Sequence, residues 1–177
     1  MRLYFIKDEY IDYLRKVEPK VPNNKHERRP FVGIVLSVNG MDYYVPLSSP
    51  KCKHKKMKNS KDFRKINGGV YGAINFNNML PVVKEALIYF NIQNIQDSKY
   101  RNLLQKQYKF IVKEFDIIKK TANELYYLCQ LEDDQLKPYE KKIKDRCCNF
   151  KLLELYCATY VISLQESNTA VTKDNNT

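Results

Sequence analysis

The sequence lacks any uninterrupted apolar run of the about 18 residues that a membrane-spanning helix needs. The first residues, Met1 to Asp8, also bring in charge too early for the apolar part of a secretory signal peptide. A peripheral membrane protein fits less well, because the cations gather in a loop and not on an amphipathic helix. The sequence therefore predicts a cytoplasmic protein without a membrane partner.

Histidine is scarce, and the cysteines have no metal-binding spacing. The chain has 2 His and 5 Cys, and no two cysteines form a Cys-x-x-Cys pair. An odd number of cysteines without that spacing supports neither a disulfide framework nor a zinc site. We therefore expect no bound metal and no other cofactor, so that any catalysis would proceed without a tightly held metal.

Acidic residues are few compared with basic ones. The chain has 20 Asp and Glu and 31 Lys and Arg, which gives a formal net charge of +11. This charge implies a polyanionic partner such as RNA or DNA. With 177 residues, of which 44% are hydrophobic, the chain is long enough for one well-buried domain and short for two. We place this domain at residues 1–164 and expect residues 165–177 to be a flexible polar tail.

Hydrophobic periodicity predicts strands in the first half of the chain and helices in the second. Asn39-Gly40 indicates a type I′ hairpin turn, because both residue types tolerate positive φ. Expected strands cover residues 2–6, 31–38, 41–47, 70–75 and about 86–90, and expected helices cover 8–17, 98 to about 128 with a kink near Asp116, and 149–164, where Asn149 is the N-cap. The fold class is therefore α+β, with a helical C-terminal half.

The segment from Pro46 to Lys56 carries the strongest indication of chemistry. It reads Pro-Leu-Ser-Ser-Pro-Lys-Cys-Lys-His-Lys-Lys, so that a strand ends in two hydroxyls followed by a run of cations. Pro50 pushes Ser49 towards an extended conformation and so favours a defined turn beside Lys51. Hydroxyls and ammonium groups both donate hydrogen bonds, which suits a phosphate. The alternative is a solvated basic loop whose serines cap a turn.

Several short motifs follow one another in a fixed order along roughly residues 1–160. They are Tyr10–Leu14, Lys20–Asn23, Phe31–Leu36, Pro46–Lys51, Ile74–Pro81, Lys106–Ile111 and Cys148–Glu154. In this order and spacing the chain resembles the ToxN/AbiQ family, the endoribonuclease toxins of type III toxin–antitoxin and phage abortive-infection systems, and most of all the AbiQ branch. The resemblance implies a compact, strongly twisted antiparallel sheet, similar to that of the MazF/Kid toxins, surrounded by helices.

The resemblance also implies metal-independent cleavage of cellular or phage single-stranded RNA. It further implies inhibition by a small repeated pseudoknot RNA antitoxin, with a higher-order protein–RNA assembly as one expected form. Without a metal, the 2′-OH of the RNA itself can attack the phosphate and leave 2′,3′-cyclic phosphate and 5′-OH ends. The alternative function is a non-catalytic RNA- or DNA-binding module, for which positive charge is sufficient.

Matching positions to the family assigns catalytic roles to Tyr10, Arg29, Ser49 and Lys51. Arg29 stands where the family has a lysine, and its guanidinium essentially cannot exchange a proton, so it should stabilise charge. Lys51 would hold the phosphate and protonate the leaving oxygen, and Ser49 would hydrogen-bond a phosphate oxygen or the 2′-OH. Tyr10 would hydrogen-bond the phosphate or stack on a base, although its helical pattern by itself favours a core aromatic.

Weaker candidates surround these positions. Ser48 replaces a family threonine, Arg28 is an alternative to Arg29, and His54 has an imidazole that titrates near neutrality, although a histidine in a lysine run is more often a surface residue. The lysines expected to follow the RNA backbone are Lys20, Lys53, Lys55, Lys56, Lys58, Lys106 and Lys109. For Lys106 and Lys109, a solvent-facing helix is an equal alternative.

Overall fold

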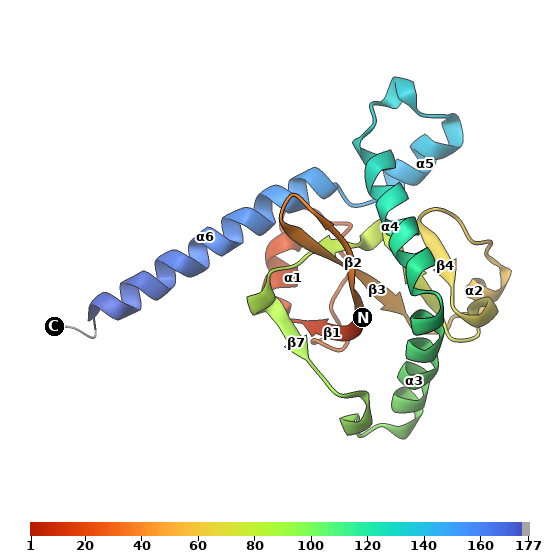
Figure 1. The fold of residues 1–177 in the computed structure, drawn as a ribbon, viewed down its shortest axis with the longest axis horizontal. Coiled ribbons are helices and arrows are strands. Elements are labelled where there is room, and N and C mark those ends of the chain that lie inside the picture. Colours follow the sequence, from red (N-terminus) through yellow and green to blue (C-terminus); the bar gives the residue numbers. More distant parts are fainter. Residues whose placement is uncertain (175–177) are drawn as a thin grey trace.

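One antiparallel sheet forms the centre of the molecule, and helices surround it (Figure 1). The computed structural model describes the backbone of residues 1–174 and the side chains of residues 1–162. The sheet has 7 strands in the order β4-β5-β3-β2-β1-β7, and β6 pairs with β3. The strands are β1 (Arg2–Ile6), β2 (Phe31–Val38), β3 (Met41–Ser48), β4 (Phe63–Lys65), β5 (Ala73–Asn75), β6 (Leu80–Pro81) and β7 (Leu87–Tyr89). The predicted α+β class is confirmed.

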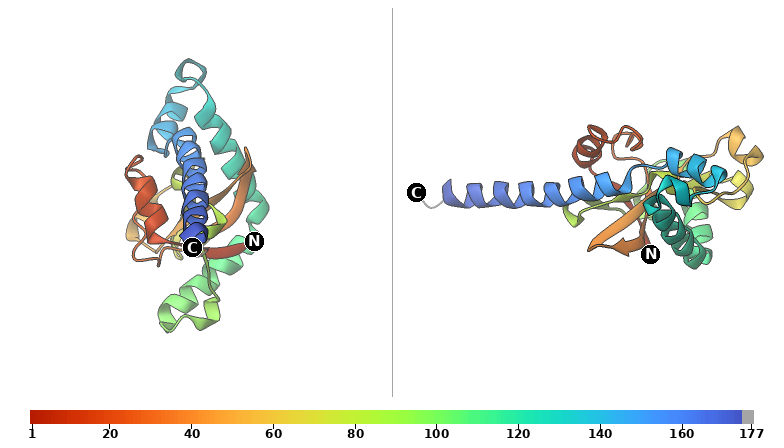
Figure 2. Two further views of the ribbon diagram at one scale, coloured as in Figure 1. Left: turned by 90° about the vertical axis from the view of Figure 1, so that its left-hand side faces the viewer. Right: turned by 90° about the horizontal axis from the view of Figure 1, so that it is seen from above.

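Six helices complete the described fold, together with short 3₁₀ turns that include η4 (Ile92–Asn94). The helices are α1 (Asp8–Arg15), α2 (Cys52–Lys56), α3 (Ser98–Lys113), α4 (Phe115–Gln130), α5 (Pro138–Arg146) and α6 (Phe150–Asp174). Helix α4 packs on β2, and α6 packs on β6 and α1. The right-hand view in Figure 2 shows α6 projecting away from the rest of the molecule. Among the described residues no helix is long and apolar enough to cross a membrane.

The local signals for turns and caps are confirmed in detail. Asn39 has φ 52° and Gly40 has φ 73°, as the predicted hairpin turn between β2 and β3 requires. Asn149 caps α6, because its Oδ1 accepts a hydrogen bond from the Leu152 backbone N at 3.1 Å. The predicted kink near Asp116 is a break at Glu114, which separates α3 from α4 with φ −104° and ψ 11°.

Two short elements were missed, and several boundaries differ from the prediction. Residues 70–72 form a turn and β5 begins only at Ala73, because Gly69 and Gly72 both adopt φ +93° and interrupt the extended chain. Strand β4 lies inside the expected cationic loop and is too short to show a period. Helix α5 was not predicted, because Ile143 is its one buried residue and a single apolar position shows no helical period. Helix α6 continues past Leu164 to Asp174; residues 163–177 lie outside the described side chains, so the flexibility of the tail stays a prediction.

A single carboxylate joins three elements of the core. Glu154 of α6 accepts hydrogen bonds from the hydroxyls of Tyr43 on β3 and Tyr126 on α4, both at 2.8 Å. Burial raises the pKa of Tyr43, and the Glu154 carboxylate raises it further, so this hydroxyl stays a neutral donor. Because Tyr43 has 0% exposure, the hydrogen bond from its hydroxyl fixes the start of α6 against the sheet.

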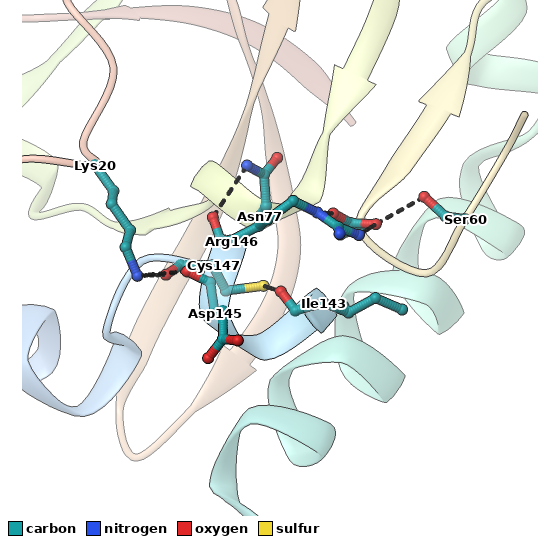
Figure 3. A network of polar contacts seen from close by, with 8 residues as sticks. Lys20, Ser60, Asn77, Ile143, Asp145, Arg146 and Cys147 are labelled. Atoms are coloured by element: carbon teal, nitrogen blue, oxygen red, sulfur yellow. Dashed lines mark hydrogen bonds and ion pairs between the residues drawn. The ribbon is translucent and has the colours of Figure 1, made fainter. Parts of the chain in front are cut away.

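A polar network connects α5 to the loop before β4 (Figure 3). Arg146 donates from Nε and Nη2 to the two carboxylate oxygens of Asp62, at 2.9 and 3.2 Å, and Ser60 Oγ donates to Asp62 at 2.7 Å. Burial by itself raises the pKa of Asp62, but the hydrogen bonds from Arg146 and Ser60 outweigh it and hold the pKa below 3.8. On the other side of this network, Lys20 Nζ donates hydrogen bonds to the backbone carbonyls of Asp145 and Cys147, at 2.7 and 2.9 Å.

Replacing Asp62 with asparagine should lower the free energy of unfolding at pH 7 by about 2 kcal/mol, since it removes charge-assisted hydrogen bonds. The lowered pKa means that this stabilisation is present above the unfolded-state pKa near 3.8 and is lost as the pH falls through the folded-state value. Urea unfolding at pH 7, 4 and 3 should therefore show the difference between wild type and Asp62→Asn shrinking towards acid. Asp116→Asn, at an ion pair with 96% exposure of the carboxylate side chain, is the control and should change little.

Candidate active site

A pocket of about 320 Å³ opens where three segments meet: the loop before β2, the end of β3 and the first turns of α3. The loop before β2 supplies the cations of the pocket, and the end of β3 supplies two serines. The residues that line it are Lys25, Arg28, Arg29, Pro30, Leu47, Ser48, Ser49, Asp97, Tyr100, Leu103 and Gln107. Four predicted site residues, Arg28, Arg29, Ser48 and Ser49, are thus brought together from two separate parts of the sequence.

The end of β3 holds the two serines in place. Ser48 pairs with Ala73 of β5, and its Oγ accepts a hydrogen bond from the Asn75 side chain. The backbone carbonyl of Ser48 accepts a longer hydrogen bond, 3.5 Å, from Gln107, whose side-chain nitrogen also donates to the Tyr71 carbonyl at 2.7 Å. Gln107 is only 2% exposed, so this contact is sheltered from water.

The Ser49 hydroxyl, in contrast, has no hydrogen-bond partner within the described part of the chain, and the residue is exposed. It is therefore free to donate to a ligand in the pocket.

Lys51 follows immediately as the N-cap residue of α2. Its backbone is extended, with φ −137° and ψ 147°, and its carbonyl accepts a hydrogen bond from the His54 backbone N at 2.9 Å. The side chain is exposed and does not itself line the pocket. Its ammonium nevertheless lies close enough to lower the pKa of Lys25 on the pocket wall. Lys51 thus stands at the rim, beside Ser49.

Arg29 forms part of the wall and is half-buried. Its Nε donates to the Asn23 carbonyl at 2.8 Å, and its Nη1 lies 3.5 Å from the Leu47 carbonyl. Burial lowers the pKa of Arg29, which remains a cation at physiological pH. Arg28 is exposed, and its backbone carbonyl accepts a hydrogen bond from the Tyr100 hydroxyl at 2.9 Å. The loop is therefore tied to both β3 and α3.

Lys25 is a pocket residue that the sequence did not single out. It begins a left-handed turn in which Lys25, His26 and Glu27 have φ 58°, 55° and 57°. L-residues adopt this conformation singly and at a cost of about 1 kcal/mol or more each. The turn is held by Asn23 Oδ1, which accepts from the Lys25 backbone N at 2.8 Å, and by Asp8 Oδ1, which accepts from the Glu27 backbone N at 3.2 Å.

Electrostatics make Lys25 different from the other cations of the pocket. Burial lowers its pKa, and repulsion from Arg29 and Lys51 lowers it further. A lysine with a lowered pKa exchanges protons more readily near neutrality than an ordinary surface lysine. The one signal for it in the sequence is Asn23-Asn24, because asparagine favours such turns.

The catalytic prediction for Tyr10 needs correction. Tyr10 has 0% exposure, and its hydroxyl donates to the Pro81 carbonyl at 2.8 Å. Its ring packs edge-on against Tyr160 of α6, with 4.9 Å between the centroids, and burial raises the pKa of its hydroxyl. The residue does not line the pocket, so the alternative of a core aromatic describes it. Its role is to hold α1 against β6 and α6.

The weaker catalytic prediction for His54 also fails on geometry. His54 is 2% exposed and packs on the Phe63 ring, with 5.7 Å between the centroids, so it is neither a surface residue nor in reach of a substrate. Burial lowers its pKa, and Lys53 and Lys51 add to the effect, which keeps the ring neutral at pH 7. Lys20 donates to the carbonyls of Asp145 and Cys147 and is exposed, so its contact with RNA stays a prediction.

The remaining lysines stay available on the surface. Lys53, Lys55, Lys56 and Lys58 are exposed on α2 and just after it, and no ion pair involves them in the described residues. On α3, Lys106 lies over the Tyr71 ring, 5.4 Å from its centroid, and Lys109 points to a different hollow from the pocket. Their contact with RNA stays a prediction.

Most charged side chains that line the pocket are positive. Asp97 is the single acid among its lining residues, and its Oδ1 already accepts from the backbone N of Lys99 and Tyr100 at the start of α3. Lys25, Arg28 and Arg29 contribute cations, with Lys51 at the rim. In the described part of the chain, no three His, Cys, Asp or Glu side chains gather as metal ligands would. The arrangement fits a phosphodiester, held by cations and by one free hydroxyl.

Comparison with known proteins gives a consistent result. The family described as toxin ToxN of type III toxin–antitoxin systems matches residues 2–158. The endoribonuclease ToxN of Bacillus thuringiensis subsp. kurstaki is 34% identical over 165 residues, which cover 90% of this chain and 84% of the relative. The endoribonuclease AbiQ of Lactococcus lactis subsp. lactis is 31% identical over 172 residues, 90% of this chain and 89% of the relative. These identities are too similar to place the chain nearer to one of the two.

Solved structures agree with the sequence comparison. A toxin structure from work on selective inhibition by a non-coding RNA pseudoknot has a TM-score of 0.79 at 34% identity, covering 90% of this chain and 96% of that one. A structure of AbiQ, described as a lactococcal anti-phage endoribonuclease of a type III system, has a TM-score of 0.73 at 27% identity, covering 90% and 97%.

Proposed function

The chain belongs to the ToxN family of type III toxin–antitoxin systems, and from this premise we propose that it is an endoribonuclease toxin that cuts single-stranded RNA without a metal ion. The observation that supports the proposal best is the one pocket in which Ser49, Arg29 and Lys25 meet, with Lys51 at its rim. A phosphodiester in this pocket would be surrounded by hydrogen-bond donors and positive charge, which is what metal-free cleavage requires.

In the proposed reaction, the 2′-OH of the RNA attacks the adjacent phosphorus, and the bond to the 5′-oxygen of the next nucleotide breaks. Arg29 and the Ser49 hydroxyl hold the non-bridging oxygens and neutralise the charge that builds up on them. Lys25, in its neutral form, accepts the 2′-OH proton, and the Lys51 ammonium donates a proton to the leaving 5′-oxygen. The products are a 2′,3′-cyclic phosphate and a 5′-OH end.

Ser49 does not act as a covalent nucleophile in this scheme. A nucleophilic serine needs a base within hydrogen-bond reach, and the one histidine near it in sequence, His54, is buried on Phe63. Ser48 supports Ser49 through its hydrogen bond with Asn75 and its pairing with β5.

The family also indicates the partner and the cellular role. We propose that a small repeated pseudoknot RNA antitoxin inhibits this protein, in a higher-order protein–RNA assembly, and that the free toxin acts on cellular or phage RNA in abortive infection. A cytoplasmic location follows from these partners. The net charge of +11 supports RNA binding, and the exposed lysines Lys53, Lys55, Lys56 and Lys58 on α2 and just after it offer contacts to phosphates.

The test is to incubate the purified protein with single-stranded RNA in excess chelator and to identify the product ends. We expect cleavage in chelator, with cyclic phosphate and 5′-OH ends, and a rate about 100-fold lower for Ser49→Ala, because one donor to the developing charge is lost. Ser37→Ala, whose hydroxyl contacts Asp42 away from the pocket, is the matched control. Strict dependence on added metal would contradict the mechanism, and RNA binding without any cleavage would favour a non-catalytic binding module.

A further inference from the structure

A second hollow, larger than the pocket of Ser49, lies on the other side of α3. This groove has a volume of about 800 Å³ and runs between β1, the end of β7 with the η4 turn, and α3, elements that surround one region in Figure 1. Its lining residues are Arg2, Leu3, Tyr89, Phe90, Asn91, Ile92, Gln93, Gln105, Tyr108 and Lys109. Its size is in the range of sites that bind small molecules or single nucleotides.

Aromatic rings line the groove, and two of them, Tyr89 and Phe90, are held by contacts with rings of β1. Tyr89 is 63% exposed, although its ring packs edge-on against Tyr4 with 5.3 Å between the centroids. Phe90 is stacked on Phe5, with the centroids 3.9 Å apart and the planes inclined by 9°. Tyr108 faces the groove from α3. An exposed aromatic that is fixed from behind binds a flat ligand at a low entropic cost.

Amide side chains lie next to the rings. Asn91 Oδ1 accepts from the Gln93 backbone N at 2.9 Å, and Gln93 Oε1 accepts from Gln105 Nε2 at 3.3 Å. These contacts leave the amide nitrogens of Asn91 and Gln93 without a hydrogen-bond partner inside the described chain, so they can donate to a ligand. Such groups match the hydrogen-bonding edges of a nucleobase.

Charge at the groove favours an anion. Arg2 and Lys109 are exposed at its edges, neither forms an ion pair among the described residues, and no acid is among the lining residues. Fixed aromatic faces, free amide donors and unpaired cations occur together in sites for single-stranded nucleic acids, where bases stack and phosphates meet cations. A hydrophobic protein partner would gain nothing from the amides and the cations.

We propose that this groove binds an unpaired nucleotide of a bound RNA, with the base stacked on Tyr89 and Tyr108 and the phosphate at Arg2 or Lys109. The two hollows share α3: Tyr100, Leu103 and Gln107 face the pocket of Ser49, whereas Gln105, Tyr108 and Lys109 face the groove. The groove is thus a second anchor for RNA on the opposite side of one helix. The proposal rests on the proposed function in one respect, namely that RNA is the ligand.

The experiment measures binding of a fluorescent oligodeoxyadenylate of about 12 nucleotides, a length within the range of single-strand sites. This probe lacks the 2′-OH and cannot be cut, so binding is observed in the native protein whether or not it is a nuclease. We expect Tyr89→Ala and Tyr108→Ala each to weaken binding about 10-fold, and Tyr89→Phe to bind as wild type, because stacking needs the ring and not the hydroxyl. Tyr127→Ala, at a 55% exposed tyrosine outside the groove, should leave binding unchanged.

Salt dependence tests the cation separately. Lys109→Ala should weaken binding and reduce the slope of log K against log salt by about 1, whereas Lys113→Ala, an exposed lysine on α3 outside the groove, should change the slope less. A hairpin RNA with an unpaired loop is the second probe. A tyrosine effect confined to the single strand would identify the substrate as the occupant, and one confined to the hairpin would identify the inhibitor RNA.

The outcomes separate this proposal from the nuclease function. Wild-type affinity of Tyr89→Ala and Tyr108→Ala for both probes, with folding verified by circular dichroism, would overturn the groove proposal and leave the nuclease proposal intact. Weakened binding by these variants in a protein that cuts no RNA would support the groove and refute the nuclease.

Discussion

Replacing Lys25 with methionine should slow RNA cleavage about 100-fold or more, the usual loss when a general base is removed. Lys25→Arg should be slow as well, although it retains the charge and the affinity for RNA, because a guanidinium does not give up its proton near neutral pH. This pair of variants separates proton transfer from charge. Both substitutions suit the site, since neither residue is β-branched and each can take the place of lysine in the left-handed turn.

The pH dependence should follow from the same residue. Burial and the charges of Arg29 and Lys51 lower the pKa of Lys25, so that the neutral base becomes available at a lower pH than for an ordinary lysine. The rate of the wild type should therefore rise with pH until Lys25 is deprotonated, and this rising limb should be missing in Lys25→Arg.

The measurement is kcat and KM on a short RNA from pH 6 to about 10, together with binding of an uncleavable analogue. His26→Met is the control, because His26 has the same left-handed conformation, φ 55°, but does not line the pocket. Full activity of Lys25→Arg with an unchanged pH profile would remove Lys25 from the role of base and leave it a holder of phosphate.

Gly72→Ala should destabilise the protein by about 3 kcal/mol or more and abolish cleavage. A Cβ at this position would lie 1.9 Å from the backbone oxygen of Ser48 and 3.0 Å from its carbonyl carbon, and the φ of +93° adds strain for any L side chain. Backbone cannot move aside as a flexible side chain can. The clash would therefore separate Ser48 from Ala73, the pair that joins β3 to β5.

Gly40→Ala is the matched control for backbone strain. Gly40 also has positive φ, +73°, but an added Cβ would meet no atom within 4 Å. We expect this variant to lose about 1 kcal/mol and to keep full activity. Urea unfolding and RNA cleavage of the two variants give the comparison. Equal stability of Gly72→Ala and Gly40→Ala would mean that β3 and β5 tolerate a shift, and would remove the close approach as a requirement of the site.

Much of the fold was readable from the sequence because its signals are local. Alternating side chains indicate β1, the hydrophobic runs on either side of Asn39-Gly40 indicate β2 and β3 with the turn between them, and Asn149 indicates the start of α6. The short β4 and the start of β5 were not readable, since three residues show no period and two glycines change the chain direction.

The candidate site, too, could be predicted from the sequence only in part. Ser49 and Lys51 are separated in the chain by Pro50 alone, which restricts the turn, so the sequence by itself placed a serine and a lysine within one short segment. The excess of positive charge likewise pointed to an anionic partner.

Only the tertiary structure decided which distant side chains join them. A left-handed turn brings Lys25 to the pocket, and packing between α1, β6 and α6 withdraws Tyr10 into the core. The groove of Tyr89 and Tyr108 likewise exists only because β1, β7 and α3 come together in the fold. The physical reason is that the exposure of an aromatic or a lysine depends on which residues pack against it. Neither a helical period nor a charge count in the sequence contains that information.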